Sequence, residues 1–278
     1  MPEHRDEDTV RDAVRQHYAG VARKGSSCCG GSSCCGPSDT GTGYEGDALI
    51  RKVGHSQSLK LGYSEEELAA APEGANLGLG CGNPQAIADL RPGEVAVDLG
   101  AGAGFDCFLA ARAVGPAGLV IGVDMTPEMV SRARENARRA GYENVDFRLG
   151  EIEHLPVGDH TADVIISNCV INLSPDKPAV YGEAFRVLKP GGRLAISDVV
   201  ATAELPPEWR DDMRLLSACI SGASTISEME EMLRSAGFVD ISVSPKDQSR
   251  EFIRHWEPGS RLEDYVLSAS IRATKPGR

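Results

Sequence analysis

Short apolar runs alternate with stretches of helical spacing through the middle of the chain. Each run is bounded by Gly, Pro or polar residues, which is typical of a buried strand, and the intervals carry apolar residues at helical spacing. The strands are predicted at 94–99, 119–123, 145–149, 163–167 and 193–199, and the helices at 105–114, 127–140 and 176–187. Because strands that alternate with helices pair in parallel, the pattern predicts a doubly wound α/β fold with a mostly parallel sheet.

The pattern changes at both ends of this alternating region. Val10, Val14 and Tyr18 recur at a spacing of four and predict an N-terminal helix over 9–24. Residues 204–223 break the alternation and predict an inserted helical segment. The alternation then resumes, and the predicted sheet reaches seven strands, with a helix at 227–236 and strands at 238–243 and 265–271.

Composition and charge narrow the class of protein. The 278 residues carry a net charge of −12, and 41% of them are hydrophobic. The sequence has no Lys/Arg-rich run, so nucleic acid and anionic membrane surfaces are not expected partners. No apolar run approaches the roughly 20 residues of a membrane span, and the charged segment 1–8 lacks the apolar core of a secretory signal. We therefore expect a cytoplasmic monomer that acts on a small molecule.

The first strand of the alternating region ends in a glycine turn. Asp98 precedes the turn, Asp124 ends the next predicted strand, and the glycines are Gly100, Gly102 and Gly104. Glycines let a backbone approach a nucleotide-like ligand closely, and an acid about 20 residues further on reaches ribose hydroxyls in such units. The turn also suits a dinucleotide-binding dehydrogenase, so by itself it predicts only a nucleotide-like ligand.

Eight cysteines stand out in a chain expected in a reducing compartment. Cys81 lies in a glycine-rich turn, Cys169 ends a predicted strand, and Cys219 lies in the inserted segment. Cys107 lies within a predicted helix and is interpreted as part of the core, as most buried cysteines are. The absence of a C-x-x-C pair argues against a zinc site. The other four occupy a Gly/Ser-rich arm that cannot build a core: Cys28, Cys29, Cys34 and Cys35.

Two further motifs accompany the glycine turn. The loop Gly150–Pro156 follows the third predicted strand, and the Leu-Lys-Pro-Gly-Gly turn Leu188–Gly192 leads into the fifth. Together with Asp98–Gly104 and Asp124, they resemble class I S-adenosylmethionine-dependent methyltransferases over residues 75–243. The resemblance implies a Rossmann-like fold and S-adenosylmethionine as cofactor. It also implies cofactor contacts from residues at the strand ends: Asp98, Gly100, Gly102, Gly104, Asp106, Asp124, Met125, Glu151 and Ile152.

The resemblance assigns each of these residues to a part of the cofactor. The glycines approach the methionine portion, Asp98 orients their turn, and Asp106 contacts the ammonium group. Asp124 takes the ribose hydroxyls. Met125 packs on the adenine, whose edge faces Glu151 and Ile152.

The surroundings of three cysteines carry a narrower resemblance. The segments Gly80–Pro84, Ser167–Asn172 and Ala218–Gly222 resemble the arsenite methyltransferases, and the likeness then covers nearly the whole chain. It implies that the thiolates of Cys169 and Cys219 hold arsenic(III), a soft ion that prefers sulfur ligands.

The same resemblance gives the remaining cysteines a supporting role. Cys81 and a cysteine of the N-terminal arm complete or recycle the arsenic site. The arm has two Cys-Cys pairs, so its contributing residue stays open, with Cys34 or Cys35 as candidate ligands.

The implied chemistry is transfer of a methyl group to the arsenic lone pair, which needs no general base. Positioning of the two reactants is then the main source of catalysis. Methylation formally oxidises arsenic, so a thiol reductant, glutathione or thioredoxin, is expected as a co-substrate or partner. The products are methylated arsenicals, which implies a role in arsenic detoxification.

The resemblance also divides the chain into three parts. Residues 1–74 hold the first helix and the arm, residues 75–203 bind the cofactor, and residues 204–278 supply the inserted helix, part of the acceptor site and the last strands. Two other functions stay open on the residues alone. One is a methyltransferase of another small molecule, such as a quinone or sterol precursor, and the other is a thiol-based metalloid-binding protein.

Overall fold

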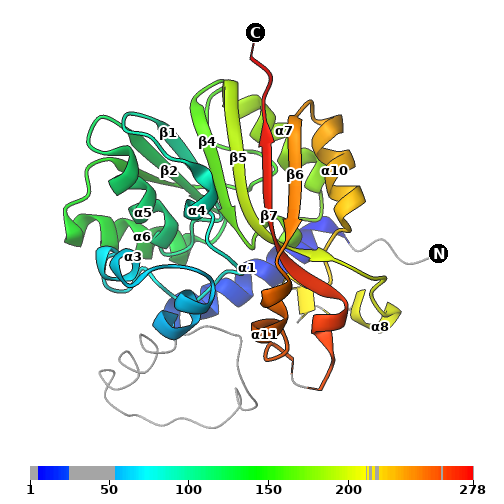
Figure 1. Cartoon of the computed structure of the whole chain (residues 1–278). Coiled ribbons are helices and arrows are strands. Elements are labelled where there is room, and N and C mark those ends of the chain that lie inside the picture. The colour runs from blue at the N-terminus through cyan, green and yellow to red at the C-terminus, as the bar shows by residue number, and fades with distance from the viewer. Residues whose placement is uncertain are drawn as a thin grey trace, which may run out of the picture.

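The computed structural model describes residues 6–24, 54–210, 212, 215–216, 219–257 and 259–277. The four cysteines of the N-terminal arm lie outside the described residues, so the structure does not test the role expected of the arm. They are Cys28, Cys29, Cys34 and Cys35. The described chain forms one seven-stranded sheet with helices on both faces (Figure 1). Its strands are β1 (Val95–Leu99), β2 (Leu119–Asp124), β3 (Val145–Leu149), β4 (Ala162–Asn168), β5 (Leu188–Ala201), β6 (Val239–Pro245) and β7 (Val266–Thr274).

The strands follow the order β3-β2-β1-β4-β5-β7-β6. All neighbouring pairs from β3 to β5 are parallel, whereas β7 runs antiparallel to both β5 and β6. The chain reverses its direction of winding between β1 and β4, which creates a topological switch point. In open α/β sheets, ligands bind at the carboxyl ends of the strands beside such a point. The mostly parallel, doubly wound sheet predicted from the sequence is confirmed.

Two apolar layers cover the two faces of the sheet. On one face, Tyr181 of α7 and Leu233 of α10 are buried against the strands. On the other, Phe108 of α5 and Ala133 of α6 are completely buried, with Ala88 of α4 beside them. Burial of this apolar surface, at about 25 cal/mol per Å², is the main force that holds the layers together. The helices are α4 (Gln85–Ala88), α5 (Phe105–Val114), α6 (Pro127–Ala140), α7 (Lys177–Val187) and α10 (Ile226–Ser235).

Helix α1 (Glu7–Lys24) packs outside these layers, near the carboxyl ends of the strands and against α6 (Figure 1). Its apolar face, Val10 and Val14, joins a third cluster that contains Cys81 and Cys219. Ion pairs fasten its polar face, including Arg15 to Glu151 at 3.3 Å. The predicted helix therefore covers one end of the sheet.

Shorter elements complete the described chain. They are α3 (Glu65–Ala70), η1 (Ile171–Leu173), α8 (Pro207–Arg210), η2 (Asp247–Ser249), α11 (Arg250–Ile253) and η3 (Leu262–Asp264). The Ser64 side chain caps α3, and the side chain of Glu67 accepts from the Ser64 N–H, as a capping box requires. No helix among the described residues is both long and apolar enough to cross a membrane.

The structure differs from the predicted elements at three places. Residues 54–60, where no element was predicted, are helical. Pro84 predicts a short helix that reaches Leu90, but α4 stops at Ala88 because Asp89 adopts a left-handed backbone with φ 47°. Strand β5 begins at Leu188 rather than 193, because the N–H of Gly191 donates to Lys275 O and the N–H of Lys275 donates to Gly192 O, which extends the pairing to the end of the sheet.

Candidate active site

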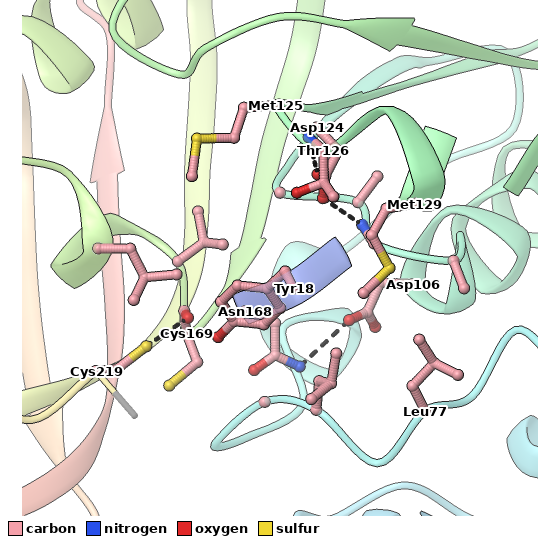
Figure 2. Close-up of a pocket in the computed structure, with 18 of the residues that line it drawn as sticks. Tyr18, Leu77, Asp106, Asp124, Met125, Thr126, Met129, Asn168, Cys169 and Cys219 are labelled. Carbon is pink, nitrogen blue, oxygen red and sulfur yellow. Dashed lines mark hydrogen bonds between the residues drawn. The ribbon is translucent and has the colours of Figure 1, made fainter. Parts of the chain in front are cut away.

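A pocket opens at the carboxyl ends of β1, β2 and β4, beside the switch point. One half of it is lined by acids and the glycine turn, and the other half by cysteines and apolar side chains (Figure 2). Asp124 and Asn168 end their strands at this edge, Asp98 is the second-last residue of β1, and Cys169 follows β4 directly. The register of parallel strands therefore brings together residues from distant parts of the sequence.

The glycine turn is held by Asp124, the acid that ends the neighbouring strand β2. The N–H of Gly102 donates to one oxygen of Asp124 at 2.9 Å, and the N–H of Thr126 donates to the other at 2.8 Å. Gly100 has a φ of 72°, and a Cβ added there would overlap the side chain of Val170, 2.9 Å from its Cβ. A larger residue at Gly100 is thus excluded both by backbone conformation and by space.

Three carboxylates face this half of the pocket: Asp98, Asp106 and Asp124. Burial raises the pKa of Asp106 to about 6, although hydrogen bonds from Tyr63 and Asn168 oppose the shift. Burial, and then the charge of Asp106, raise the pKa of Asp98 well above its usual range. Among the described residues, none of the three acids forms an ion pair with lysine or arginine. The site is therefore arranged to receive a cation.

A hydrogen-bond network connects the acid half to the Cys81 turn. The Tyr63 hydroxyl donates to Asp106 at 2.8 Å, and the Asn168 amide donates to both Tyr63 and Asp106, at 3.0 and 3.2 Å. The oxygen of the same amide accepts from the Cys81 N–H at 3.1 Å, and its nitrogen donates to Gly82 O at 2.9 Å. Asn168, immediately before Cys169, thus ties the two halves of the pocket together.

Seven of the nine residues expected to contact the cofactor line this pocket, while Gly104 and Glu151 do not. Gly104 has a φ of 94°, and a Cβ there would lie 2.7 Å from Phe108, so its role is to permit close packing. Glu151 is turned toward α1, where Arg15 binds it. Its neighbour Glu153 lines the pocket in its place. The seven lining residues are Asp98, Gly100, Gly102, Asp106, Asp124, Met125 and Ile152.

Several lining residues were not found by reasoning from the sequence. Helix α1 contributes Arg11, Val14 and Tyr18, and Trp256 lies beyond α11. The spacing of Val14 and Tyr18 showed that α1 has an apolar face but not what that face covers. Asn168 had a clearer signal, since it is a polar residue at the end of an apolar strand.

The cysteine half brings three thiols together. The thiol of Cys219 donates to the carbonyl oxygen of Cys169 at 2.8 Å (Figure 2). The sulfur atoms of Cys81 and Cys169 lie within 4.8 Å of each other. Cys81 and Cys219 are 1% and 2% exposed, and Cys169 is half-buried at the pocket wall. Cys107 is completely buried in α5 and donates to Asp98 at 3.1 Å, as its interpretation as a core residue anticipated.

Two of these cysteines have a backbone conformation that residues other than glycine rarely adopt. Cys169 and Cys219 have φ values of 59° and 62°, in the left-handed region. Such a conformation costs on the order of 1 kcal/mol or more and is found mostly where the surroundings enforce it. Hydrogen bonding with Cys219 and Cys81 raises the pKa of the Cys169 thiol well above its usual range, and burial raises the pKa of Cys81. Cys81 and Cys169 are therefore thiols rather than thiolates in the ligand-free site.

The segment that carries Cys219 is fastened to the segment that carries Cys169. The ammonium group of Lys177 donates to Gly222 O and to Ser224 Oγ, the latter at 2.7 Å. The amide of Asn172 donates to Cys219 O at 3.4 Å. The distance between the two cysteines is therefore set by the fold before any ligand arrives.

Comparison with known proteins places this site in a family. Residues 90–237 match the model of a methyltransferase domain. The arsenite methyltransferase of Halobacterium salinarum is 51% identical over 276 residues, which cover 99% of this chain and 68% of that protein. The arsenite methyltransferase of Aquipseudomonas alcaligenes is 47% identical over 158 residues, 54% of this chain and 46% of that protein.

A solved structure agrees with these sequence matches. The arsenic(III) S-adenosylmethionine methyltransferase of Chlamydomonas reinhardtii superposes with a TM-score of 0.61 at 34% identity, covering 82% of this chain and 73% of that one. Because the match to the Halobacterium salinarum protein covers 99% of this chain, it includes both halves of the pocket. This chain belongs to the arsenite methyltransferase family.

Proposed function

We propose that the protein transfers a methyl group from S-adenosylmethionine to arsenic(III) held by Cys169 and Cys219, with Cys81 completing the sulfur set. The observation that carries the proposal is that Cys169 and Cys219 line a pocket whose other half is lined by acids, while the sulfur atom of Cys81 lies within 4.8 Å of that of Cys169. Trivalent arsenic is soft and binds sulfur in preference to oxygen or nitrogen. Three converging thiols in an apolar surrounding match that preference.

The acid half fits S-adenosylmethionine by charge and by shape. When bound, S-adenosylmethionine supplies an electrophilic methyl group on a positively charged sulfur. Asp98 and Asp106 face the pocket without a described basic partner, so they complement the positive charges of the cofactor. Asp124 keeps lone pairs free beyond its two backbone hydrogen bonds, which suits ribose hydroxyls.

The chain's own residues mainly position the reactants and keep water out. Cys169 and Cys219 hold the arsenic with its lone pair free, and no described side chain has to remove a proton from it. Tyr18 and Trp256 contribute aromatic side chains to the lining of the pocket. Holding the two reactants in position lowers the activation barrier to methyl transfer by several kcal/mol.

Methylation leaves arsenic formally oxidised, so each further methylation consumes two electrons. We propose that thiols supply them, through Cys81 and an arm cysteine as a disulfide pair that glutathione or thioredoxin then reduces. The sulfur atoms of Cys81 and Cys169 lie within 4.8 Å, which supports a redox role for this pair as well. The arm cysteines are the natural subject of a cysteine-by-cysteine replacement series.

The direct test is incubation with arsenite, isotopically labelled S-adenosylmethionine and glutathione, followed by separation of the arsenic species. We expect labelled methylarsenicals whose formation requires all three components. A chain that binds the cofactor but gives no labelled arsenical would refute the proposed activity and leave only a binding function.

The carboxylates give the cofactor site a pH dependence. Asp106 ionises with a pKa of about 6, and its ionised form attracts the cationic cofactor. As the pH falls through 6, protonation removes that attraction, so we expect the affinity for S-adenosylmethionine to fall by up to about tenfold per pH unit. Calorimetric titrations from pH 8 to pH 5 measure it. Adenosine, which lacks both positive groups, is the control, and an equal fall in its affinity would contradict the assignment.

A further inference from the structure

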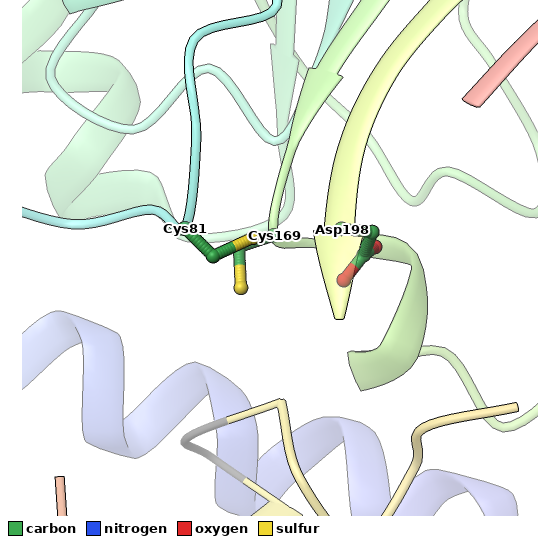
Figure 3. A group of neighbouring side chains, drawn as sticks. All are labelled: Cys81, Cys169 and Asp198. Carbon is green, nitrogen blue, oxygen red and sulfur yellow. The ribbon is translucent and has the colours of Figure 1, made fainter. Parts of the chain in front are cut away.

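Another acid, Asp198, lies beside Cys81 and Cys169 and does not belong to the acid-lined half of the pocket. It belongs to β5, its side chain is 0% exposed, and one carboxylate oxygen lies within 4.8 Å of the sulfur atoms of both Cys81 and Cys169 (Figure 3). Burying a carboxylate is costly unless its charge is compensated. The groups that contact the Asp198 carboxylate therefore decide whether its negative charge is already compensated in the ligand-free protein.

Only neutral groups donate to Asp198 within the described part of the chain. The N–H groups of Ile171 and Val199 donate to it at 3.0 and 2.7 Å, and the amide of Asn172 donates at 2.9 Å. Lys177 is the basic residue whose field reaches Asp198, but its ammonium group is committed to Gly222 and Ser224. Three N–H donors stabilise the ionised carboxylate without cancelling its charge.

The proposed reaction moves a positive charge toward this acid. The arsenic lone pair forms the bond to the methyl carbon, and the bond between that carbon and the sulfonium sulfur breaks, with its electron pair going to sulfur. The departing thioether is neutral, and arsenic, now pentavalent and bonded to its sulfur ligands and the methyl group, carries the positive charge. No proton moves in this step, and no other oxidant or reductant takes part.

We infer that the Asp198 carboxylate stabilises the positive charge that develops on arsenic during methyl transfer, an inference that rests on the proposed function. Before transfer the positive charge lies on the sulfonium sulfur of the methyl donor, and afterwards it lies on the arsenic bound to Cys169, beside Asp198. A fixed negative charge that lies closer to the arsenic than to the sulfonium sulfur stabilises the transition state more than the bound reactants. It therefore lowers the barrier to methyl transfer and does not merely tighten substrate binding.

A purely positional role is the competing explanation. Asn172 donates to Asp198, to Val199 O and to Cys219 O, so it links the acid to the backbone of a cysteine. If the role is positional, loss of Asp198 lets the cysteine side chains move and weakens arsenite binding. If Asp198 stabilises the developing charge, its loss preserves arsenite binding and slows methyl transfer.

The test replaces the charge at nearly constant size, with Asp198→Asn. We expect the affinities for arsenite, followed by the fluorescence of Trp256 in the pocket, and for S-adenosylmethionine to stay within about threefold of wild type. The single-turnover rate of methyl transfer, with both ligands saturating, should fall by about 100-fold.

Two further variants serve as comparisons. Asn172→Ala keeps the carboxylate and should have the opposite effect, with weaker arsenite binding and a nearly unchanged rate at saturation. Asp247→Asn, at a side chain that is 92% exposed, controls for the change in net charge.

The outcomes separate this inference from the proposed function. A wild-type protein that forms no methylarsenical refutes the function itself. A wild-type protein that methylates arsenite while Asp198→Asn transfers methyl groups at the same rate overturns only the inference. Arsenite binding that weakens as much as the rate falls also overturns it, in favour of the positional role. If Asp198→Asn does not fold, Asp198→Ser removes the same charge while its hydroxyl oxygen can accept the Val199 N–H, and the same criteria apply.

Discussion

Replacing Cys169 with serine should abolish arsenite methylation while leaving S-adenosylmethionine binding intact. The hydroxyl oxygen is hard and a poor ligand for arsenic(III), so the arsenic loses the sulfur that lies at the pocket wall beside the cofactor half. Loss of positioning alone costs about 100-fold in rate, and loss of a ligand adds to it. The same assay of labelled arsenicals, with calorimetry for the cofactor, measures both effects.

Cys107→Ser is the matched control for this change. Cys107 is as buried as Cys81 and Cys219 but lies in α5, and a serine there can still donate to Asp98. We expect its arsenite affinity to equal that of wild type. If Cys169→Ser retains methylation at the wild-type rate, or if Cys107→Ser loses arsenite binding to the same extent, the assignment of the sulfur site is wrong.

Much of the site could be predicted because parallel strands bring their carboxyl ends to one edge. Strand positions read from apolar runs were enough to place Asp98, Asp124 and Cys169 together. A polar residue inside an apolar run was a usable signal as well. Asp198 gave that signal within the predicted strand 193–199, but a strand pattern does not show which residues of other segments its carboxylate meets.

The rest depends on packing between distant elements, which a local pattern does not encode. The apolar face of α1 requires a partner, but nothing in its spacing identifies the pocket that Val14 and Tyr18 line. Glu151 is expected at the adenine, and its ion pair with Arg15 of α1 could not be predicted from its own loop. Asn168 gains its role through Tyr63 and the Cys81 turn, which lie more than 80 residues away in sequence.

Gly222→Ala should disable the arsenic half of the site without touching the cofactor half. A Cβ at Gly222 would overlap the carbonyl oxygen of Asn172 and lie 3.0 Å from its carbonyl carbon. Because the obstacle is backbone, no change of rotamer relieves it, and the segment that carries Cys219 has to shift. We expect a loss of about 1–3 kcal/mol in unfolding free energy, as overpacking usually produces, and a loss of arsenite affinity of at least tenfold. Denaturant titration and arsenite-dependent fluorescence measure the two.

Gly182→Ala provides the contrast, because a Cβ at that position in α7 meets no atom within 4 Å. Alanine is a better helix former than glycine by about 0.5–1 kcal/mol, so this variant should be slightly more stable and bind arsenite as wild type does. S-adenosylmethionine affinity should be unchanged in both variants, since neither glycine lines the pocket. Unchanged arsenite affinity in Gly222→Ala would mean that the spacing between Cys169 and Cys219 is set by the bound arsenic rather than by the fold. The left-handed backbone of both cysteines argues for the fold, because a ligand-imposed spacing would not require that strain in the ligand-free chain.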